Sequence, residues 1–109
     1  MPPQARTPPL GWRSWNCFFA GVSDAKIRQA IDAITDKNWT VDGEIVSLAD
    51  VGYNSVGIDE GWEGCGEGVV VDGHKTQHYA NGTPAINNKF PDMAGLVAYG
   101  HSKNLRMGW

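Results

Sequence analysis

The fold is decided by the stretch VGYNSVGIDEGWE, residues 51–63, in which an apolar run ends abruptly in acids. β-Branched and aromatic residues bounded by glycines predict a buried strand over residues 53–59. Asp59 and Glu60 close that run, and Trp62 follows two residues later. In α/β proteins, ligands bind at the carboxyl ends of parallel strands. The two acids and the indole therefore lie where a binding site is expected.

The chemistry of these three side chains suits a sugar. Carboxylates accept hydrogen bonds from hydroxyl groups, and an indole offers a flat apolar face. A sugar ring is polar at its rim and apolar on its C–H faces, so it matches both. The alternative interpretation is an acidic strand end that only keeps this edge of the sheet solvated. The spacing alone leaves both interpretations open.

The composition is that of one globular domain. The chain has 109 residues, of which 41% are hydrophobic and 19% charged. A net charge of −3 gives no electrostatic basis for binding nucleic acid or an anionic membrane. No apolar run approaches the ~20 residues that a membrane-spanning helix needs. We therefore expect neither nucleic acid nor a membrane as a partner.

Two helices are predicted on either side of the deciding stretch. Apolar residues recur at helical spacing between residues 24 and 36, and Ser23 is a suitable N-cap. The stripe consists of Ile27, Ala30, Ile31 and Ile34. The same spacing predicts a helix over residues 92–103, which Asn104 ends. A single helical turn is expected over residues 48–51.

Two more strands complete the pattern. Trp12 and Trp15 bracket one strand within residues 10–16, and residues 105–109 form the other. The order β-α-β-α-β is typical of an α/β protein in which each helix is a right-handed crossover between parallel strands. A final apolar strand without a covering helix leaves an unpaired edge. We therefore expect the chain to be truncated.

Two segments lack a regular pattern. Residues 39–43 are expected to form a loop. Residues 61–90 are rich in glycine, and a loop of this length is uncommon in a compact domain unless it is functional. Val69–Val71 followed by Asp72-Gly73 predicts a small hairpin, which we expect to fold over a site.

The histidines do not predict a metal centre. His74 and His78 lie four residues apart in the expected hairpin rather than on a helix, and no third ligand is near them in the sequence. We expect no metal and no cofactor. Two cysteines, Cys17 and Cys65, are too few for a disulfide scaffold.

Three long motifs resemble a known family. They are TPPLGWRSWN (7–16), SLADVGYNSVGIDEGWEGC (47–65) and FPDMAGLVAYGHSKNLRMGW (90–109). In order and spacing they resemble the N-terminal part of the α-galactosidase and α-N-acetylgalactosaminidase family of retaining glycoside hydrolases (family 27). The resemblance implies an α/β fold made of the first three βα-type units of a (β/α)8 TIM barrel, incomplete in this chain. Residues 1–9 would be an extended N-terminal segment, and residues 10–109 the N-terminal part of the truncated barrel.

The same resemblance assigns substrate-binding residues. Trp15 matches the tryptophan that lines the galactose pocket. Asp59 and Glu60 match the two acids that hold the 4- and 6-hydroxyls of the sugar. Two departures stand out. Glu60 replaces the usual aspartate and is longer by one methylene, and Gly61 stands where many relatives carry a disulfide-bonded cysteine.

No catalytic residue is expected within this chain. Retaining glycosidases use two carboxyl groups about 5–5.5 Å apart. In the resembled family these are aspartates after the fourth and sixth strands, which this chain does not reach. Asp59 and Glu60 are adjacent, and adjacent residues on a strand face opposite sides, so we assign them to binding. The resemblance implies an α-galactoside as the partner, hydrolysed by the full-length enzyme. The alternative is a non-catalytic carbohydrate-binding or degenerate barrel, which Glu60 favours.

The resemblance also implies a secreted, vacuolar or lysosomal protein. Two glycosylation sequons agree with that compartment, Asn38-Trp39-Thr40 and Asn81-Gly82-Thr83. Secretory residence favours a disulfide. The resemblance implies that Cys65 pairs with a cysteine farther along the full-length protein rather than with Cys17. Galactose versus N-acetylgalactosamine, linkage preference and oligomeric state stay open.

Overall fold

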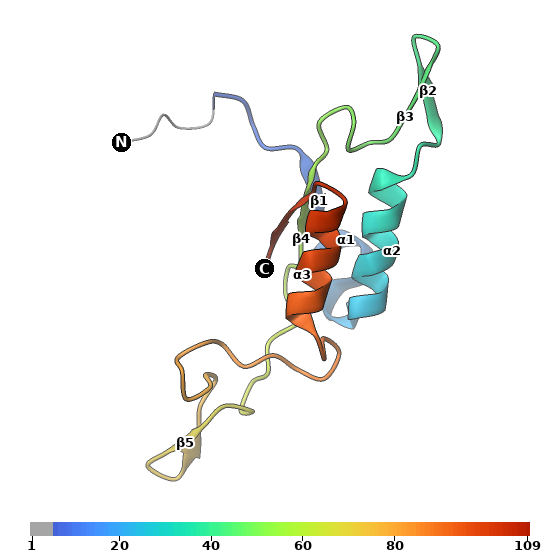
Figure 1. The fold of residues 1–109 in the computed structure, drawn as a ribbon. Coiled ribbons are helices and arrows are strands. Elements are labelled where there is room, and N and C mark those ends of the chain that lie inside the picture. The colour runs from blue at the N-terminus through green and yellow to red at the C-terminus, as the bar shows by residue number, and fades with distance from the viewer. Residues whose placement is uncertain (1–5) are drawn as a thin grey trace.

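Three short parallel strands form the sheet on which the other elements are arranged (Figure 1). They are β1 (Gly11–Arg13), β4 (Ser55–Gly57) and β7 (Arg106–Gly108), in the order β1-β4-β7. The structure is a computed structural model that describes residues 6–109. Helix α2 (Asp24–Thr35) lies between β1 and β4 in the chain, and α3 (Met93–Ser102) lies between β4 and β7. The predicted order β-α-β-α-β and the parallel pairing are confirmed.

The register of the sheet separates its two faces. Trp12, Val56 and Met107 are aligned across the three strands and face the helices. The residues on either side of them face away from the helices, because successive side chains alternate along a strand. These residues are Gly11, Arg13, Ser55, Gly57, Arg106 and Gly108. The face without helices therefore carries small side chains and two arginines.

The core lies between the sheet and the two helices. Ile27 and Ile31 of α2, Leu96 of α3 and Val56 of β4 are buried there, as the helical spacing predicted. Burial of this apolar surface is the main contribution to the stability of such a unit. At Gly100 of α3 a side chain would overlap Met107 of β7, so the glycine permits this close packing.

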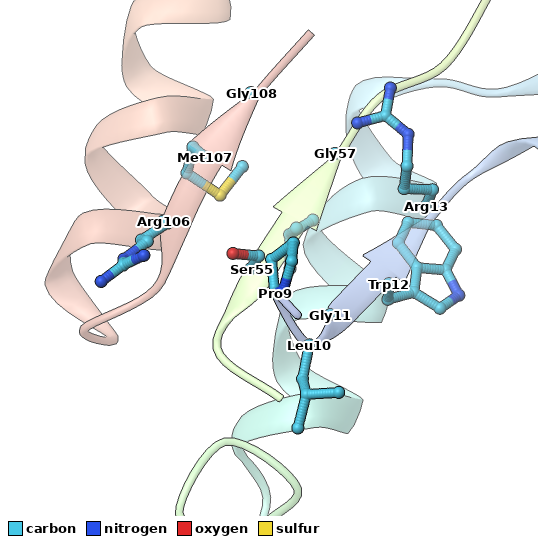
Figure 2. A pocket seen from close by; sticks show the side chains of 11 residues that line it. Pro9, Leu10, Gly11, Trp12, Arg13, Ser55, Gly57, Arg106, Met107 and Gly108 are labelled. Atoms are coloured by element: carbon cyan, nitrogen blue, oxygen red, sulfur yellow. The ribbon is translucent and has the colours of Figure 1, made fainter. Parts of the chain in front are cut away.

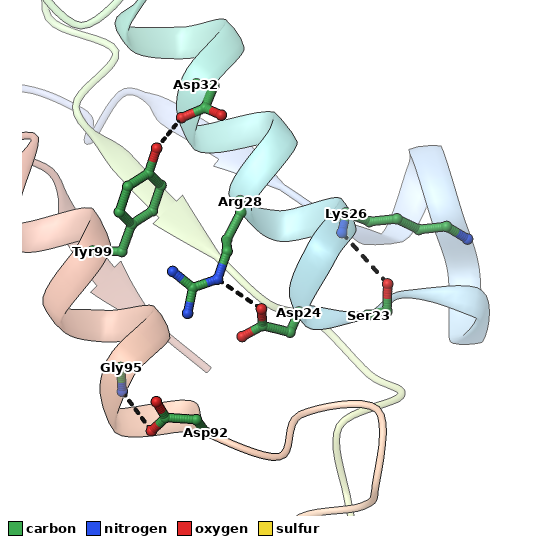
Figure 3. Close-up of polar contacts among 8 residues, drawn as sticks. All are labelled: Ser23, Asp24, Lys26, Arg28, Asp32, Asp92, Gly95 and Tyr99. Carbon is green, nitrogen blue, oxygen red and sulfur yellow. Dashed lines mark hydrogen bonds and ion pairs between the residues drawn. The ribbon is translucent and has the colours of Figure 1, made fainter.

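Both helices begin at capping residues (Figure 3). The Lys26 N–H donates to Ser23 Oγ over 3.4 Å, and the Gly95 N–H donates to Asp92 Oδ1 over 2.9 Å. These bonds satisfy backbone donors that have no partner within the helix. After α3, Asn104 adopts a φ of 60°, which ends the helix as predicted.

Polar contacts join the outer surfaces of α2 and α3 (Figure 3). The Tyr99 hydroxyl donates to Asp32, and this bond to a carboxylate raises the pKa of Tyr99. Arg28 Nε donates to Asp24 Oδ1 over 2.7 Å, and its guanidinium lies 5.2 Å from the centre of the Tyr99 ring. The bond to Asp24 raises the pKa of Arg28. The two crossover helices are thus held together by charged groups outside the core.

Several predicted elements differ in the structure. The strand expected over residues 53–59 is limited to Ser55–Gly57, and Trp15 begins a short helix, α1 (Trp15–Phe18), instead of closing a strand. A 3-10 helix, η1 (Phe19–Gly21), follows it. The expected extended segment is exposed and irregular over residues 6–9, and the rest of it lies outside the described residues. Within the described part of the chain, no helix is long and apolar enough to cross a membrane.

Residues 39–46 form a hairpin where a loop was expected. Strand β2 (Trp39–Val41) pairs with β3 (Glu44–Val46) in antiparallel fashion. Asp42 and Gly43 between them have φ values of 50° and 82°, which is the geometry of a type I′ turn. Trp39, Val41 and Ile45 are exposed, so the hairpin buries no apolar face. The sequence does carry a hairpin signal here, because Asp42-Gly43 lies between two short apolar runs as Asp72-Gly73 does in the hairpin that was predicted.

Residues 62–89 form an arm with a hairpin at its tip (Figure 1). The predicted hairpin is confirmed as β5 (Val70–Val71) and β6 (His74–Lys75), joined through Asp72 and Gly73. The expectation that it folds over a site is wrong, because Figure 1 shows it at the outer tip of the arm, away from the sheet. The arm is closed at its root by Asn87, whose Nδ2 donates to the Gly61 carbonyl over 2.7 Å.

The helical turn expected over residues 48–51 is present as a single hydrogen-bonded turn before β4, in which the Val51 N–H donates to the Leu48 carbonyl over 3.2 Å and the Gly52 N–H donates to the Ala49 carbonyl over 3.1 Å. The Ser47 N–H donates to Asp50 Oδ2 over 2.8 Å, and the Asp50 N–H donates back to Ser47 Oγ over 3.0 Å. Lys37 Nζ also donates to Asp50 Oδ2 over 2.8 Å. The bonds from Lys37 and from the Ser47 backbone lower the pKa of Asp50 from 3.8 to about 2.

Leu96→Ala should lower the free energy of unfolding by about 2–5 kcal/mol, because it leaves a cavity between α3 and the sheet. Urea unfolding followed by circular dichroism measures this loss. Ala98→Ser, on the exposed side of the same helix, is the control and should change stability by no more than about 0.5 kcal/mol. Equal losses in both variants would contradict the assigned core.

The carboxyl group of Asp50 should titrate near pH 2, and Lys37→Met should raise its pKa. A depressed pKa stabilises the folded state above the ordinary pKa, and this contribution is lost as the pH falls from about 4 to about 2. Asp50→Asn should therefore remove part of the pH dependence of the melting temperature in that range. NMR titration of the side-chain carboxyl carbon gives the pKa, and a midpoint near 4 would contradict the contact with Lys37.

Candidate sugar-binding site

The buried hydroxyl of Ser14 connects the carboxyl ends of β1 and β4. Ser14 is fully buried, and its backbone N–H donates to the Gly57 carbonyl over 3.2 Å. Its Oγ accepts a hydrogen bond of 2.9 Å from the backbone N–H of Asp59. The Ile58 N–H donates in turn to the Gly108 carbonyl of β7 over 2.9 Å. The backbone of Asp59 is therefore held in place just beyond the end of β4.

The carboxylate of Asp59 is held by Arg13. Arg13 Nε donates to Asp59 Oδ2 over 3.2 Å, and Arg13 Nη2 donates to the Ile58 carbonyl over 3.3 Å. The other oxygen of Asp59, Oδ1, accepts no hydrogen bond from residues 6–109 and is free to accept one from a ligand. Gly57 makes this arrangement possible, because a side chain there would overlap the Arg13 guanidinium. Figure 2 shows the guanidinium beyond Gly57, at the end of β4.

Glu60 differs from Asp59 in its surroundings. Its side chain is exposed and makes no hydrogen bond or ion pair with the part of the chain that the structure describes. The loop beyond it is ordered by Glu63, whose Oε2 accepts a 2.7 Å hydrogen bond from the Gly61 N–H. Asp59 is thus a positioned carboxylate, and Glu60 is a free one.

Two of the expected aromatic residues have different roles in the structure. Trp15, at the start of α1, is 37% exposed and meets the ring of Phe19 edge to face, with 5.4 Å between ring centres. Trp62 is half-buried, packs against the core, and lines a separate cavity of about 150 Å³ at the root of the arm, with Glu63, His78 and Pro84 among its other lining residues. Of the two, Trp15 is the more exposed and is the candidate for contact with a sugar at the strand ends.

The segment after Trp15 is fixed against the loop that carries the acids. Lys26 Nζ donates to the Gly21 carbonyl over 2.7 Å, and Lys89 Nζ donates to the Ala20 carbonyl over 2.6 Å. A Cβ at Gly61 would lie 3.0 Å from the Ala20 oxygen, and Gly61 has a φ of 100°. The two ends of residues 14–20 therefore touch residues 59 and 61.

A concavity of about 420 Å³ lies on the face of the sheet that the helices leave open (Figure 2). Arg13 lines it at the carboxyl ends of the strands, and Arg106 and Ser55 line it nearer the other end. The glycines beside them provide the space. Asp59 does not line the concavity but contacts it through Arg13, so one guanidinium and one carboxylate lie together at the carboxyl ends of β1 and β4, a donor and acceptor pair that suits a hydroxyl-rich ligand.

Sequence reasoning missed Arg13, Ser14 and Phe19. The alternation of a strand could have identified Arg13, because it places residues 11 and 13 on the face opposite Trp12. Nothing in the sequence shows that Ser14 is buried or that Phe19 is exposed. Cys17 and Cys65 are both exposed and free. Residues 6–109 contain no group of three or more His, Cys, Asp or Glu side chains placed to hold a metal ion.

Comparison with known proteins identifies relatives along almost the whole chain, although no family model matches it. α-Galactosidase 3 of Arabidopsis thaliana is 33% identical over 108 residues, which are 95% of this chain and 20% of that protein. The α-galactosidase of rice, Oryza sativa subsp. japonica, is 31% identical over 94% of this chain and 20% of its own length. The chain thus spans about a fifth of the length of the curated relatives it matches.

Solved structures give the same result. α-Galactosidase I of Mortierella vinacea superposes with a TM-score of 0.70 at 29% identity, over 94% of this chain and 21% of that one. The α-galactosidase of Saccharomyces cerevisiae, solved with raffinose, has a TM-score of 0.68 at 24% identity over 94% of this chain and 18% of its own. The latter likeness shows the fold alone.

Sequence and fold together make this chain a relative of the glycoside hydrolases. Within that class its relatives are the α-galactosidases, which it matches over about a fifth of their length. The family resemblance drawn from the three sequence motifs is confirmed.

Ser14→Ala should lower the free energy of unfolding by about 1–3 kcal/mol, because it leaves the Asp59 N–H without its buried acceptor. Chemical unfolding measures the loss. Asn88→Ala, at an exposed position, is the control and should lie within about 0.5 kcal/mol of the unsubstituted protein. An unchanged midpoint for Ser14→Ala would contradict the role given to this hydroxyl.

Proposed function

We propose that the protein containing this chain is a retaining exo-glycosidase that hydrolyses terminal α-linked galactose. Residues 10–109 would supply the first three strands of a (β/α)8 barrel and part of its sugar-binding edge. The observation that carries the proposal is the match to proteins named α-galactosidase over 94–95% of the chain. The position of Asp59 at the carboxyl end of β4 supports it, since barrel enzymes bind substrate at that edge.

Asp59, Glu60 and Trp15 are the proposed substrate-binding residues. Asp59 would accept a hydrogen bond from a galactose hydroxyl through Oδ1, while Arg13 holds Oδ2. Glu60, with no partner in residues 6–109, would accept from a neighbouring hydroxyl. A hydrogen bond to a charged group contributes about 1.5–3 kcal/mol. Trp15 would cover an apolar C–H face of the ring with its exposed indole.

The chemical step would be carried out by residues outside this segment. Retention requires a nucleophile and an acid/base about 5–5.5 Å apart. Asp59 and Glu60 are adjacent in the chain, so their carboxyl groups do not face each other across a glycosidic bond as a catalytic pair must. We assign both to holding the sugar in place, so that the terminal galactose is presented in one orientation to the two catalytic carboxyl groups.

Residence in the secretory pathway is part of the proposal. Asn38 and Asn81, the acceptor residues of the two sequons, are exposed. Cys65 is exposed and free to pair with a cysteine beyond this segment. Exposure of the two asparagines and of Cys65 leaves them accessible to glycosylation and to disulfide formation in that compartment.

In the protein expressed from its complete reading frame, Asp59→Asn should lower kcat/KM for an α-galactoside by about 10- to 100-fold, because one charged hydrogen bond to the sugar is lost. The melting temperature should change little, since the backbone bond from Asp59 to Ser14 remains. Asp72→Asn, at the tip of the β5–β6 hairpin, is the matched control and should leave both quantities unchanged.

Two results would contradict this function. A fall in melting temperature with unchanged galactose affinity would make Asp59 a structural carboxylate. Galactose binding without hydrolysis in the unsubstituted protein would instead indicate a non-catalytic carbohydrate-binding barrel, the alternative that the Glu60 substitution favours.

A further inference from the structure

Trp15 and Phe19 form an exposed aromatic pair beside the candidate sugar site. Phe19 is 58% exposed, and the planes of the two rings are inclined by 84°. Single exposed apolar residues are ordinary on protein surfaces. Phe19 differs from such residues in two ways, namely its place next to the loop of the acids and its backbone conformation.

The position is fixed by two contacts. Ser14 accepts a hydrogen bond from Asp59 at one end of the segment, and Gly61 packs on Ala20 at the other. Each aromatic residue is therefore next in the chain to a residue that touches the loop of the acids. Trp15 is next to the contact with Asp59, and Phe19 is four residues farther on, next to the contact with Gly61.

The backbone of Phe19 is strained. Its φ and ψ are 48° and −139°, in a region that bulky residues rarely adopt. Such a conformation persists only where the surroundings enforce it, and it is common in ligand-binding segments. Glycine would adopt it without cost, yet this chain carries a phenylalanine there.

The surroundings that enforce this conformation are on both sides of Phe19. Its N–H donates to the Trp15 carbonyl, and the next two carbonyls are held by Lys89 and Lys26. The lysine bonds leave the ring free, because they all engage the backbone. The segment is therefore built to hold an aromatic ring outward beside Trp15.

We propose that Phe19 is the binding platform for the sugar unit attached to the terminal galactose, an inference that rests on the proposed function. Trp15, Asp59 and Glu60 serve the terminal ring, and Phe19 extends the apolar surface to the next one. An uncharged aromatic ring matches the C–H face of a second pyranose. Phe19 is thus a specificity-determining residue that favours oligosaccharides over free galactose.

The test is calorimetric titration of the protein expressed from its complete reading frame with two probes. One is galactose, and the other is an α-galactosyl disaccharide in which sulfur replaces the glycosidic oxygen, so that it is not hydrolysed. The unsubstituted protein should bind the disaccharide about 5- to 10-fold more tightly than galactose. Phe19→Gly should abolish this preference and leave galactose affinity unchanged, while Phe19→Tyr should retain it.

The melting temperature of Phe19→Gly distinguishes a sugar-binding role of the ring from a role in packing. Phe19→Gly relieves the positive φ, so its melting temperature should stay the same or rise. A fall of several degrees would show that the ring packs against another part of the protein and would overturn the proposal. Trp39→Ala removes a comparably exposed ring from the β2–β3 hairpin and should alter neither affinity.

The remaining outcomes separate the two proposals. Equal affinity of the unsubstituted protein for both probes, or an equal loss for both in Phe19→Gly, overturns the platform and leaves the galactose site standing. Absence of binding to either probe overturns the proposed function and the platform with it.

Discussion

The buried hydroxyl of Ser14 is the point on which the candidate site depends. Through its backbone it continues the pairing of β1 with β4, and through its side chain it fixes the N–H of Asp59 just beyond the sheet. A polar group buried without a partner is costly, so the fold favours this arrangement over others in which the two strand ends separate. The same position in the chain turns the backbone from β1 into α1 and so directs Trp15 to the rim. Ser14 thus holds Asp59 and the start of α1 in a fixed position relative to the ends of β1 and β4.

Arg13 shows how the site and the sheet use the same residues. It occupies the open face of β1 because Trp12, its neighbour, is packed against the helices. The absence of a side chain at Gly57 lets the guanidinium reach across β4 to Asp59 and to the Ile58 carbonyl. The register of the strands therefore places the Arg13 guanidinium on this face, and the missing side chain at Gly57 gives it the room to reach Asp59.

The parts of this fold that the sequence predicts are those in which one periodic pattern dominates. The apolar stripe of α2 and the capping residues Ser23 and Asp92 are local signals, and the structure follows them. The β2–β3 hairpin was expected to be a loop, although Asp42-Gly43 between two short apolar runs is itself a local hairpin signal. Trp15 was expected at a strand end because Trp12 and Trp15 bracket a short predicted strand, whereas the chain turns at Ser14 and helix α1 begins at Trp15. In the site, residue types could be predicted, but the contact of Arg13 with Asp59 joins positions 46 apart and depends on tertiary structure.

The root of the arm over residues 62–89 has a consequence for how this protein can diversify. Asn87 and Lys89 hold the root by donating to the carbonyls of Gly61 and Ala20, which every amino acid possesses. The acceptor positions therefore impose no demand on side-chain identity through these bonds, and the tip lies far from the sheet. Insertions, deletions or exchanges at the tip of the arm, over residues 69–76, can accumulate without altering the spacing of the strand ends, provided that Asn87 and Lys89 keep the root in place. The tip is thus a module whose length and composition are free to vary between descendants of one ancestral protein.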